Sequence, residues 1–262
     1  MRPVPVRYRS AELTAASIVA LIPARFHSSR LPGKPLADIG GQPMIAHVVQ
    51  RAAAAASIDA VIVATDDPRV VEAVVACGGE ARLTDPAHRS GTDRLAEVAA
   101  TLPCGIVVNV QGDEPLLSPA AIDEAVAPLL ADPTIEMSTL CRPLEDAEAG
   151  NPHIVKVVRD AQGFALYFSR SPIPFLRDAD AEAATPRWAH VGLYVYRRDT
   201  LLRLARLAPT PLERAESLEQ LRALEHGIRI AVVETTHAAA GVDTPDDLER
   251  VRQQWLAAGS SV

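Results

Sequence analysis

Lysine, cysteine and aromatic residues are scarce in this chain of 262 residues, and long apolar runs are missing. Its three cysteines, Cys77, Cys104 and Cys141, lie far apart and form no CxxC pair. Such a set provides neither a disulfide framework nor a zinc site, which fits a reducing compartment. No segment approaches the roughly 20 apolar residues of a membrane span, and residues 1–17 lack the apolar core of a signal peptide. We therefore expect a cytoplasmic protein with no membrane partner and a disordered extension over residues 1–17.

The charge balance is acidic, with 33 Asp and Glu residues against 26 Lys and Arg residues and a formal net charge of −7. This acidity and the low aromatic content disfavour a nucleic-acid partner. An apolar content of 48% excludes a disordered protein. Only two of the basic residues, Lys34 and Lys156, are lysines. Because Arg and Lys are not interchangeable at tight sites, each of these positions is a candidate for a required ammonium group.

Apolar segments alternate with helical patterns along the first half of the chain. The predicted strands are residues 18–23, 60–65 and 105–110, and the predicted helices are residues 43–56, 68–77, 92–100 and 119–130. This alternation predicts a parallel sheet with helices on both faces. After about residue 136 the strands lie closer together; they are residues 137–141, 154–159, 164–168, 191–196 and 229–233. Two further helices are predicted, over residues 211–225 and 245–257.

These patterns predict an α/β protein with a three-layer αβα, Rossmann-like nucleotide-binding fold and a mixed sheet. We expect one domain over residues 18–258. Within it, residues 136–200 would form an antiparallel insertion that binds an acceptor substrate.

A basic loop follows the first strand. It contains Arg25, Arg30 and Lys34 and no acidic residue. Ligands of parallel α/β sheets bind at the carboxyl ends of the strands, and this loop leaves such an end. The pattern predicts a nucleoside triphosphate site in which Lys34 neutralises charge near the reacting phosphorus; a solvated basic loop is the alternative. The absence of a GxxxxGK[ST] motif disfavours an ordinary P-loop enzyme.

Eight motifs follow one another in a fixed order. They are LIPAR at 21–25, SRLPGKPL at 29–36, GQPM at 41–44, HRSGTDR at 88–94, VNVQGDEP at 108–115, LYFSR at 166–170, LEQLR at 218–222 and GVDTPDDL at 241–248. Over residues 18–252 the chain thereby resembles the 3-deoxy-manno-octulosonate cytidylyltransferase (CMP-Kdo synthetase) family of nucleotidyltransferases. The resemblance implies transfer of CMP from CTP to the sugar acid 3-deoxy-D-manno-octulosonate (Kdo), for lipopolysaccharide assembly. It also implies a homodimer, with the insertion at residues 136–200 taking part in dimerisation.

The resemblance implies a role for particular residues. The catalytic residues would be Lys34, Arg25 and Asp113. The nucleotide would be bound by Arg25, Arg30, Lys34, Ser90, Gly91 and Arg94. The acceptor would be bound by Gln111, Arg170, His190, Tyr194, Glu219 and Gln220. Mg²⁺ would be held by Asp113 and Asp243, since this ion prefers one or two carboxylates together with phosphate oxygens and water.

Local patterns allow other interpretations of several of these residues. Asp243 could instead cap the helix that begins at Pro245, and Thr92 could cap the helix that follows it. His190 and Tyr194 could be core residues of a strand. Glu219 and Gln220 would lie in the middle of a predicted helix, where a solvated face is usual. Asp246 and Asp247 are interpreted as favourable charges in the first turn of the last helix.

Two residues near His190 differ from the pattern of the family. Ala189 stands where the family tends to have a basic residue, and Val195 stands where it tends to have glycine. The alternative function is therefore cytidylyl transfer to a related sugar acid, such as an amino-Kdo or a sialic acid. A non-catalytic sensor with the same fold is an alternative of a different class. Because Asp113 and Asp243 are both present, the sequence disfavours such a sensor.

Overall fold

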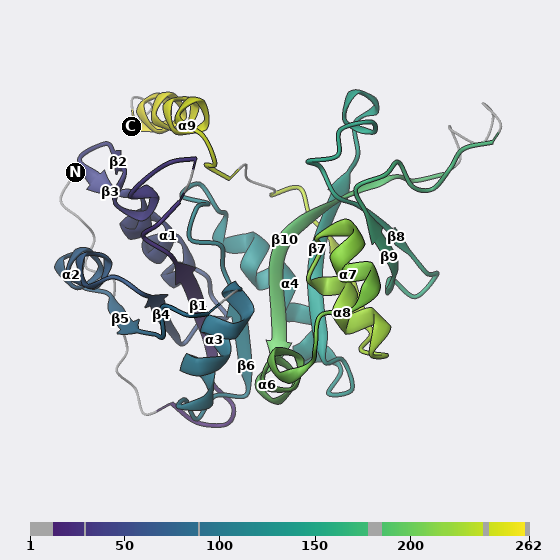
Figure 1. Ribbon diagram of the computed structural model, residues 1–262, viewed down its shortest axis with the longest axis horizontal. Helices are drawn as coiled ribbons and strands as arrows, with labels where there is room; N and C mark the ends of the chain where they lie inside the picture. Colours follow the sequence, from purple (N-terminus) through teal and green to yellow (C-terminus); the bar gives the residue numbers. More distant parts are fainter. Residues whose placement is uncertain (1–12, 29, 89, 178–184, 238–240, 260–262) are drawn as a thin grey trace. The chain divides into compact units, whose positions relative to one another are not determined.

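The computed structural model describes residues 13–28, 30–88, 90–177, 185–237 and 241–259 (Figure 1). The chain divides into two compact units. Unit 1 comprises Met1–Asp123 and Ala239–Val262, and unit 2 comprises Glu124–Ala238. The boundary falls within helix α4 (Pro119–Ala131). Most of the predicted extension, residues 1–17, lies outside the described residues.

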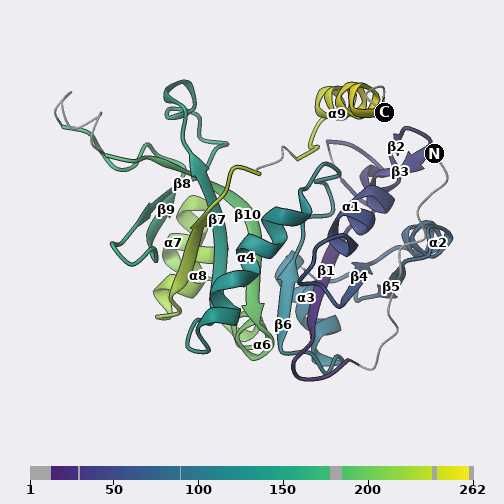
Figure 2. The ribbon, with the colours of Figure 1, turned by 180° about the vertical axis from the view of Figure 1, so that it is seen from behind.

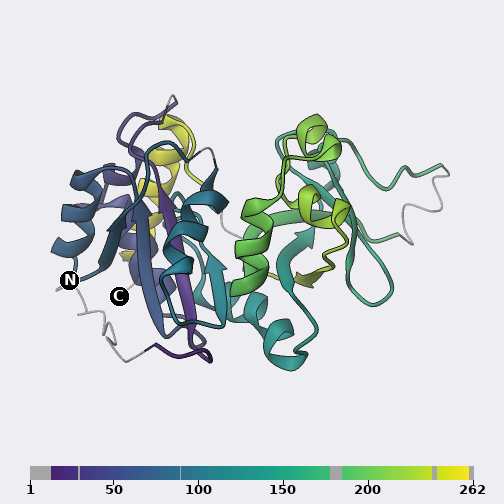
Figure 3. The same cartoon turned by 60° about the horizontal axis from the view of Figure 1, so that its bottom comes forward.

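The described part of unit 1 contains a parallel sheet with the strand order β6-β1-β4-β5. Its strands are β1 (Ile18–Ala24), β4 (Ala60–Thr65), β5 (Glu80–Leu83) and β6 (Ile106–Asn109). Residues 19–22 of β1 have no exposed surface, as expected of a strand buried on both faces. Helices α1 (Met44–Ala53), α2 (Pro68–Ala76) and α3 (Gly91–Ala100) pack around these strands (Figure 3). The short edge strand β5 was not predicted.

Helix starts in unit 1 follow from polar side chains that satisfy free backbone N–H groups. Asp67 caps α2 as predicted, since its carboxylate accepts a hydrogen bond from the N–H of Arg69 at 2.9 Å. Helix α3 begins at Gly91, and its N-cap, Ser90, lies two residues before the predicted cap. Ser90 and Asp93 form a capping box there, in which each side chain accepts from the backbone N–H of the other. The prediction of Thr92 as the cap is therefore wrong.

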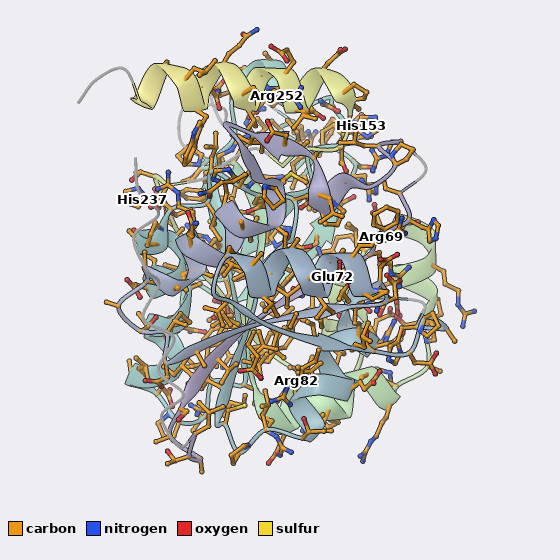
Figure 4. All side chains as sticks on the ribbon, turned by 90° about the vertical axis from the view of Figure 1, so that its left-hand side faces the viewer. Arg69, Glu72, Arg82, His153, His237 and Arg252 are labelled. Atoms are coloured by element: carbon orange, nitrogen blue, oxygen red, sulfur yellow. The ribbon has the colours of Figure 1, made fainter. Side chains whose placement is uncertain are left out.

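The C-terminal helix α9 (Pro245–Gly259) packs beside the short strands β2 (Asp38–Ile39) and β3 (Gln42–Pro43), as Figures 1 and 2 show. The apolar cluster at this contact consists of Ile39, Met44, Val242, Leu248 and Val251, with Trp255 packed against it. Arg252, labelled in Figure 4, donates a hydrogen bond to the carbonyl of Asp38 at 2.9 Å. These contacts fix the start of α9 next to the segment that follows the basic loop.

Unit 2 contains a sheet of mixed direction. Strand β7 (Met137–Pro143) is parallel to β11 (Ile230–Glu234) and antiparallel to β10 (Trp188–Arg197). Strands β8 (Lys156–Arg159) and β9 (Ala165–Ser169) form the predicted hairpin, and β8 also pairs with β10. The remaining described elements before the last helices are the 3₁₀ turn η2 (Asp146–Glu148) and helix α6 (Arg198–Arg206). Parallel and antiparallel strands with covering helices confirm the predicted α/β class.

The single helix predicted over residues 211–225 is wrong. The structure has two short helices there, α7 (Pro211–Glu216) and α8 (Gln220–Glu225). Ser217 interrupts them with a φ of 52° in the left-handed region, which ends a helix. The carbonyls of Glu216 and Ser217 accept hydrogen bonds from Arg170 instead of continuing the helix. Glu219 consequently lies at the start of α8 rather than in the middle of a helix.

Three observations concern the thiols, the helices and the possible metal-binding groups of the described residues. Cys77, Cys104 and Cys141 are free thiols. No helix among the described residues is both long and apolar enough to cross a membrane. The same residues contain no group of three or more His, Cys, Asp or Glu side chains placed to hold a metal ion.

Candidate active site

A cavity of about 330 Å³ lies in unit 1, beside the carboxyl ends of β1 and β6. These two strands are parallel neighbours, so the loops that follow them meet at one edge of the sheet. Six residues with predicted roles line the cavity, namely Arg25, Arg30, Lys34, Gln111, Asp113 and Asp243. Segments far apart in sequence therefore line one cavity.

Lys34 is the central cation of this cavity. Its ammonium Nζ donates to Asp113 Oδ2 at 2.6 Å and to Asp243 Oδ1 at 3.0 Å, and the side chain is only 13% exposed. Arg30, whose side chain is 64% exposed, reaches the same Oδ1 of Asp243 at 3.1 Å. Two carboxylates from distant segments thus face one ammonium group, while a more exposed guanidinium stands at the side open to solvent.

The backbone around Lys34 explains its orientation. Gly33 has a φ of 68°, a left-handed conformation that glycine adopts at little cost. Pro35 follows in the first turn of the short 3₁₀ helix η1 (Lys34–Leu36). The ring of Phe26 lies 3.4 Å from the position that a Cβ would occupy on Gly33. The Pro-Gly-Lys-Pro stretch is therefore a fixed turn that presents the ammonium to the cavity.

Asp113 is held in place by its main chain. Its carbonyl accepts a hydrogen bond from the N–H of Val242 at 2.9 Å, which joins the loop after β6 to the segment before α9. Burial and the negative charge of Asp113 raise the pKa of the adjacent Glu114 to about 8. Asp113 and Asp243 are the carboxylates that accept hydrogen bonds from Lys34.

Gly112 lies where the loop passes closest to β1. A Cβ on Gly112 would stand 2.8 Å from the carbonyl oxygen of Pro23, a backbone atom that cannot rotate away. We expect Gly112→Ala to shift the Asp113 turn, to destabilise the fold by about 1–3 kcal/mol and to lower kcat/KM. Thermal melting and steady-state kinetics measure both effects. Gly150→Ala is the control, because nothing lies within 4 Å of its added Cβ; equal Tm values for the two variants would contradict this account.

The hydrogen bonds at the start of α9 show which residue caps this helix. The helix is capped by Thr244, whose Oγ1 accepts from the N–H of Asp247 at 3.2 Å. Asp247 Oδ2 in turn accepts from the backbone N–H groups of Asp243 at 3.1 Å and Thr244 at 2.9 Å. Asp243 is therefore not the cap, and its carboxylate faces the cavity. Asp247 was interpreted only as a favourable charge in the first helical turn, but its carboxylate also fixes the backbone of Asp243.

Removal of the Asp247 carboxylate tests this positioning. We expect Asp247→Ala to lower kcat/KM about tenfold, because outer groups that orient site ligands typically have effects of this size. Asp246→Ala is the matched control, since Asp246 is the exposed neighbour in the same turn. Steady-state kinetics of the two variants give the comparison, and equal activities would refute the role of Asp247.

The effect of Asp247→Ala on stability should depend on pH. Although burial alone would raise it, hydrogen bonds from Thr244 and Asp243 hold the pKa of Asp247 at about 2. A lowered pKa stabilises the fold above the unfolded pKa of about 4, and this stabilisation is lost as the pH falls toward 2. The difference in Tm between wild type and Asp247→Ala should therefore shrink between pH 5 and pH 2.

Three of the predicted nucleotide-binding residues lie at the start of α3 or contact the segment before it. Arg25, which lines the cavity, also donates to the carbonyl of His88 at 2.7 Å and so joins the basic loop to the segment before α3. Ser90 and Gly91 form the start of α3, and Gly91 packs near the ring of Pro23. Their contacts with a nucleotide stay predictions.

Arg94 lies inside unit 1 and has no exposed surface. Its guanidinium donates to Asp66 at 3.0 Å and to Thr84. Asp66 also accepts from the N–H of Phe26 at 3.2 Å, in the basic loop. In the structure Arg94 therefore supports that loop from within, and the predicted nucleotide contact of Arg94 stays untested.

In unit 2 three of the predicted acceptor-binding residues lie together. The rings of His190 and Tyr194, both on β10, have centroids 5.4 Å apart, and His190 Nε2 lies 2.9 Å from Thr139 Oγ1. Burial lowers the pKa of His190 to about 3, so that its imidazole is neutral at neutral pH. Burial and the nearby charge of Glu219 raise the pKa of Tyr194. His190 and Tyr194 therefore offer neutral hydrogen-bonding groups beside the negative charge of Glu219, and such a cluster suits hydroxyls better than a carboxylate.

Arg170 is the cation among the predicted acceptor-binding residues. It lies just after β9 and is half-buried. Gln220 begins α8 and is buried. Gln111 belongs to unit 1, where it lines the cavity beside Asp113. The acceptor roles of these residues stay predictions.

Comparison with known proteins identifies the family. The cytidylyltransferase family model matches residues 19–230. A 3-deoxy-manno-octulosonate cytidylyltransferase of Geobacter sulfurreducens is 55% identical over 249 residues, covering 91% of this chain and 99% of the relative. The chain belongs to the 3-deoxy-manno-octulosonate cytidylyltransferase family. Another 3-deoxy-manno-octulosonate cytidylyltransferase, from Geobacter metallireducens, is 57% identical over 243 residues, or 89% of this chain and 96% of the relative.

A solved structure supports the same assignment. The structure of a CMP:2-keto-3-deoxy-manno-octonic acid synthetase complexed with CTP is 48% identical to this cytidylyltransferase. It matches with a TM-score of 0.89 over 94% of this chain and 100% of the other. These findings confirm the resemblance and the nucleotidyltransferase fold predicted from the motifs.

Proposed function

We propose that this protein transfers CMP from CTP to Kdo and releases pyrophosphate, which activates Kdo for lipopolysaccharide assembly. The observation that carries the proposal is the cavity of unit 1, where Lys34 is held between Asp113 and Asp243. The names of relatives that are 55–57% identical over about nine-tenths of the chain support CTP and Kdo as substrates. The alternative acceptors, an amino-Kdo or a sialic acid, receive no support from these relatives.

We include Mg²⁺ in the proposal. Asp113 and Asp243 come from separate segments yet direct their carboxylates at one cation, the ammonium of Lys34. Two carboxylates beside a cavity fit an ion that completes its coordination with phosphate oxygens and water. These two side chains would hold the ion, which when bound would neutralise phosphate charge and lower the pKa of a hydroxyl.

The residues of the chain would act by positioning and charge neutralisation. In the reaction the anomeric hydroxyl of the sugar releases its proton, its oxygen forms a bond to the α-phosphorus, and the bond from that phosphorus to pyrophosphate breaks. Lys34, Arg25 and Arg30 supply positive charge beside the transferred group, where such transfer needs it. Among the acceptor-binding candidates, Arg170 is suited to bind the carboxylate of the sugar acid, because a guanidinium pairs with it through two hydrogen bonds.

We also propose that the protein is a homodimer and that it is located in the cytoplasm. The homodimer follows from the family resemblance, and light scattering on the purified protein tests it. The cytoplasmic location is likewise a proposal, which cell fractionation tests.

A substrate panel tests the proposed reaction. CTP, UTP and ATP are each combined with Kdo, 8-amino-8-deoxy-Kdo and a sialic acid, and pyrophosphate release is followed with and without Mg²⁺. We expect kcat/KM to be highest for CTP with Kdo, by about a hundredfold over sialic acid, and to require Mg²⁺. A preference for another acid would contradict the proposed acceptor, and release without any acid would contradict transfer.

A further inference from the structure

The second lysine of the chain is buried and has no partner of opposite charge among its hydrogen bonds. Lys156 lies at the start of β8 and has no exposed surface. Its ammonium donates to the carbonyls of Asn151 at 2.9 Å, Ile154 at 2.7 Å and Arg170 at 2.7 Å. An ammonium group has three N–H donors and no acceptor, so these three carbonyls satisfy it completely.

These hydrogen bonds converge on Arg170 from two sides. The carbonyl of Arg170 is bound by Lys156, and its N–H donates to the carboxylate of Glu216 at 2.9 Å. The same ammonium also binds the loop at residues 151–154, and the Arg170 side chain reaches that loop through the carbonyl of Pro152 at 3.0 Å. Lys156 therefore fixes both the backbone of Arg170 and a loop against which its guanidinium rests.

The guanidinium of Arg170 is only partly occupied by these contacts. It donates to the carbonyls of Pro152, Glu216 and Ser217 at 3.0, 2.7 and 3.3 Å. A guanidinium has five N–H donors, so two, one on each terminal nitrogen, are left over from these three contacts. A carboxylate can accept both in parallel. Because the side chain is already ordered, little conformational entropy is lost when it binds such a ligand.

We propose that Lys156 is a positioning residue for binding of the acceptor's carboxylate, acting through Arg170. The inference rests on the proposed function, since it takes Arg170 as the carboxylate-binding residue for Kdo. It also explains why a lysine is kept in a chain that otherwise uses arginine. A guanidinium in this buried position would carry five donors for three carbonyls, and its flat shape does not match their arrangement around one point.

Steady-state kinetics of Lys156→Met test the proposal, because methionine has similar size but no donor. We expect KM for Kdo to rise about tenfold to a hundredfold, with kcat and KM for CTP within about twofold of wild type. Arg159→Met is the control. It removes another cation of β8, which donates to Val232 at 3.1 Å and does not contact Arg170. If Lys156→Met does not fold, Lys156→Gln, which keeps two N–H donors, replaces it.

A double-mutant cycle with Arg170→Lys separates positioning from general stability. If Lys156 acts through Arg170, Lys156→Met should add little to the rise in KM for Kdo that Arg170→Lys causes by itself. Additive effects, an unchanged KM for Kdo in a folded variant, or an equal rise in KM for CTP would overturn the inference while leaving the proposed function intact. A wild-type protein that does not turn over Kdo would overturn the proposed function, and the inference with it.

Discussion

Replacement of Lys34 with alanine is expected to lower kcat by about a thousandfold, since loss of one preorganised group at a developing charge costs factors of this size. The Lys34 side chain is 13% exposed, against 64% for Arg30, and its Nζ lies 2.6 Å from Asp113 and 3.0 Å from Asp243. Without it, two carboxylates would face the triphosphate with less positive charge between them. Single-turnover measurement of pyrophosphate release determines the effect on the chemical step.

Two further variants test whether the effect of Lys34→Ala is specific to an ammonium group at this position. Lys34→Arg retains the charge but replaces a compact ammonium with a planar guanidinium, so we expect it to recover only a small part of the lost activity. Arg82→Ala is the control for a lost cation in unit 1; Arg82 lies on β5, away from α9 in Figure 4, and pairs with Glu80. Normal turnover by Lys34→Ala would refute the catalytic role of Lys34.

Asp113→Asn is expected to reduce kcat by about a hundredfold to a thousandfold at the Mg²⁺ concentration that saturates wild type. The amide keeps the shape of the side chain but removes the negative charge that a divalent cation requires. Asp243→Asn should have the same sign of effect. Titration of activity with Mg²⁺ should show a higher half-saturating concentration for both variants.

Removal of the proposed Mg²⁺ provides the complementary experiment. A chelator should abolish turnover by wild type, and added Mg²⁺ should restore it. Asp246→Asn serves as the matched control, because this exposed carboxylate lies near Asp243 in sequence but does not line the cavity. If the activity of Asp113→Asn depends on Mg²⁺ concentration in the same way as that of wild type, Asp113 is not a ligand of the metal.

Elements whose signals are local were predictable from the sequence. The apolar run of β4 (Ala60–Thr65) was predicted with its observed bounds, and Asp67 caps α2 as expected. Strand β5 was missed because its residues, Glu80 to Leu83, are a short polar edge segment without an apolar run. The break at Ser217 was missed for a different reason. It depends on hydrogen bonds from Arg170, a residue 47 positions earlier, which no local pattern reveals.

The candidate site shows the same division. The motifs led to Lys34, Asp113 and Asp243, and the structure brings these three side chains into contact. The supporting residues were not predictable in this way. Asp247 resembles any acidic residue in a first helical turn until its hydrogen bond to the Asp243 backbone is seen. Lys156 was singled out by the scarcity of lysine alone, and its role follows only from the three carbonyls around its ammonium.

The identity of the product tests the central claim most directly. Wild-type protein is incubated with CTP, Kdo and Mg²⁺, and the products are resolved by ³¹P NMR and mass spectrometry. The account predicts a single sugar product in which one CMP is joined to one Kdo, formed with one equivalent of pyrophosphate. A phosphorylated sugar with CDP, or pyrophosphate formed while Kdo remains unchanged, would contradict it.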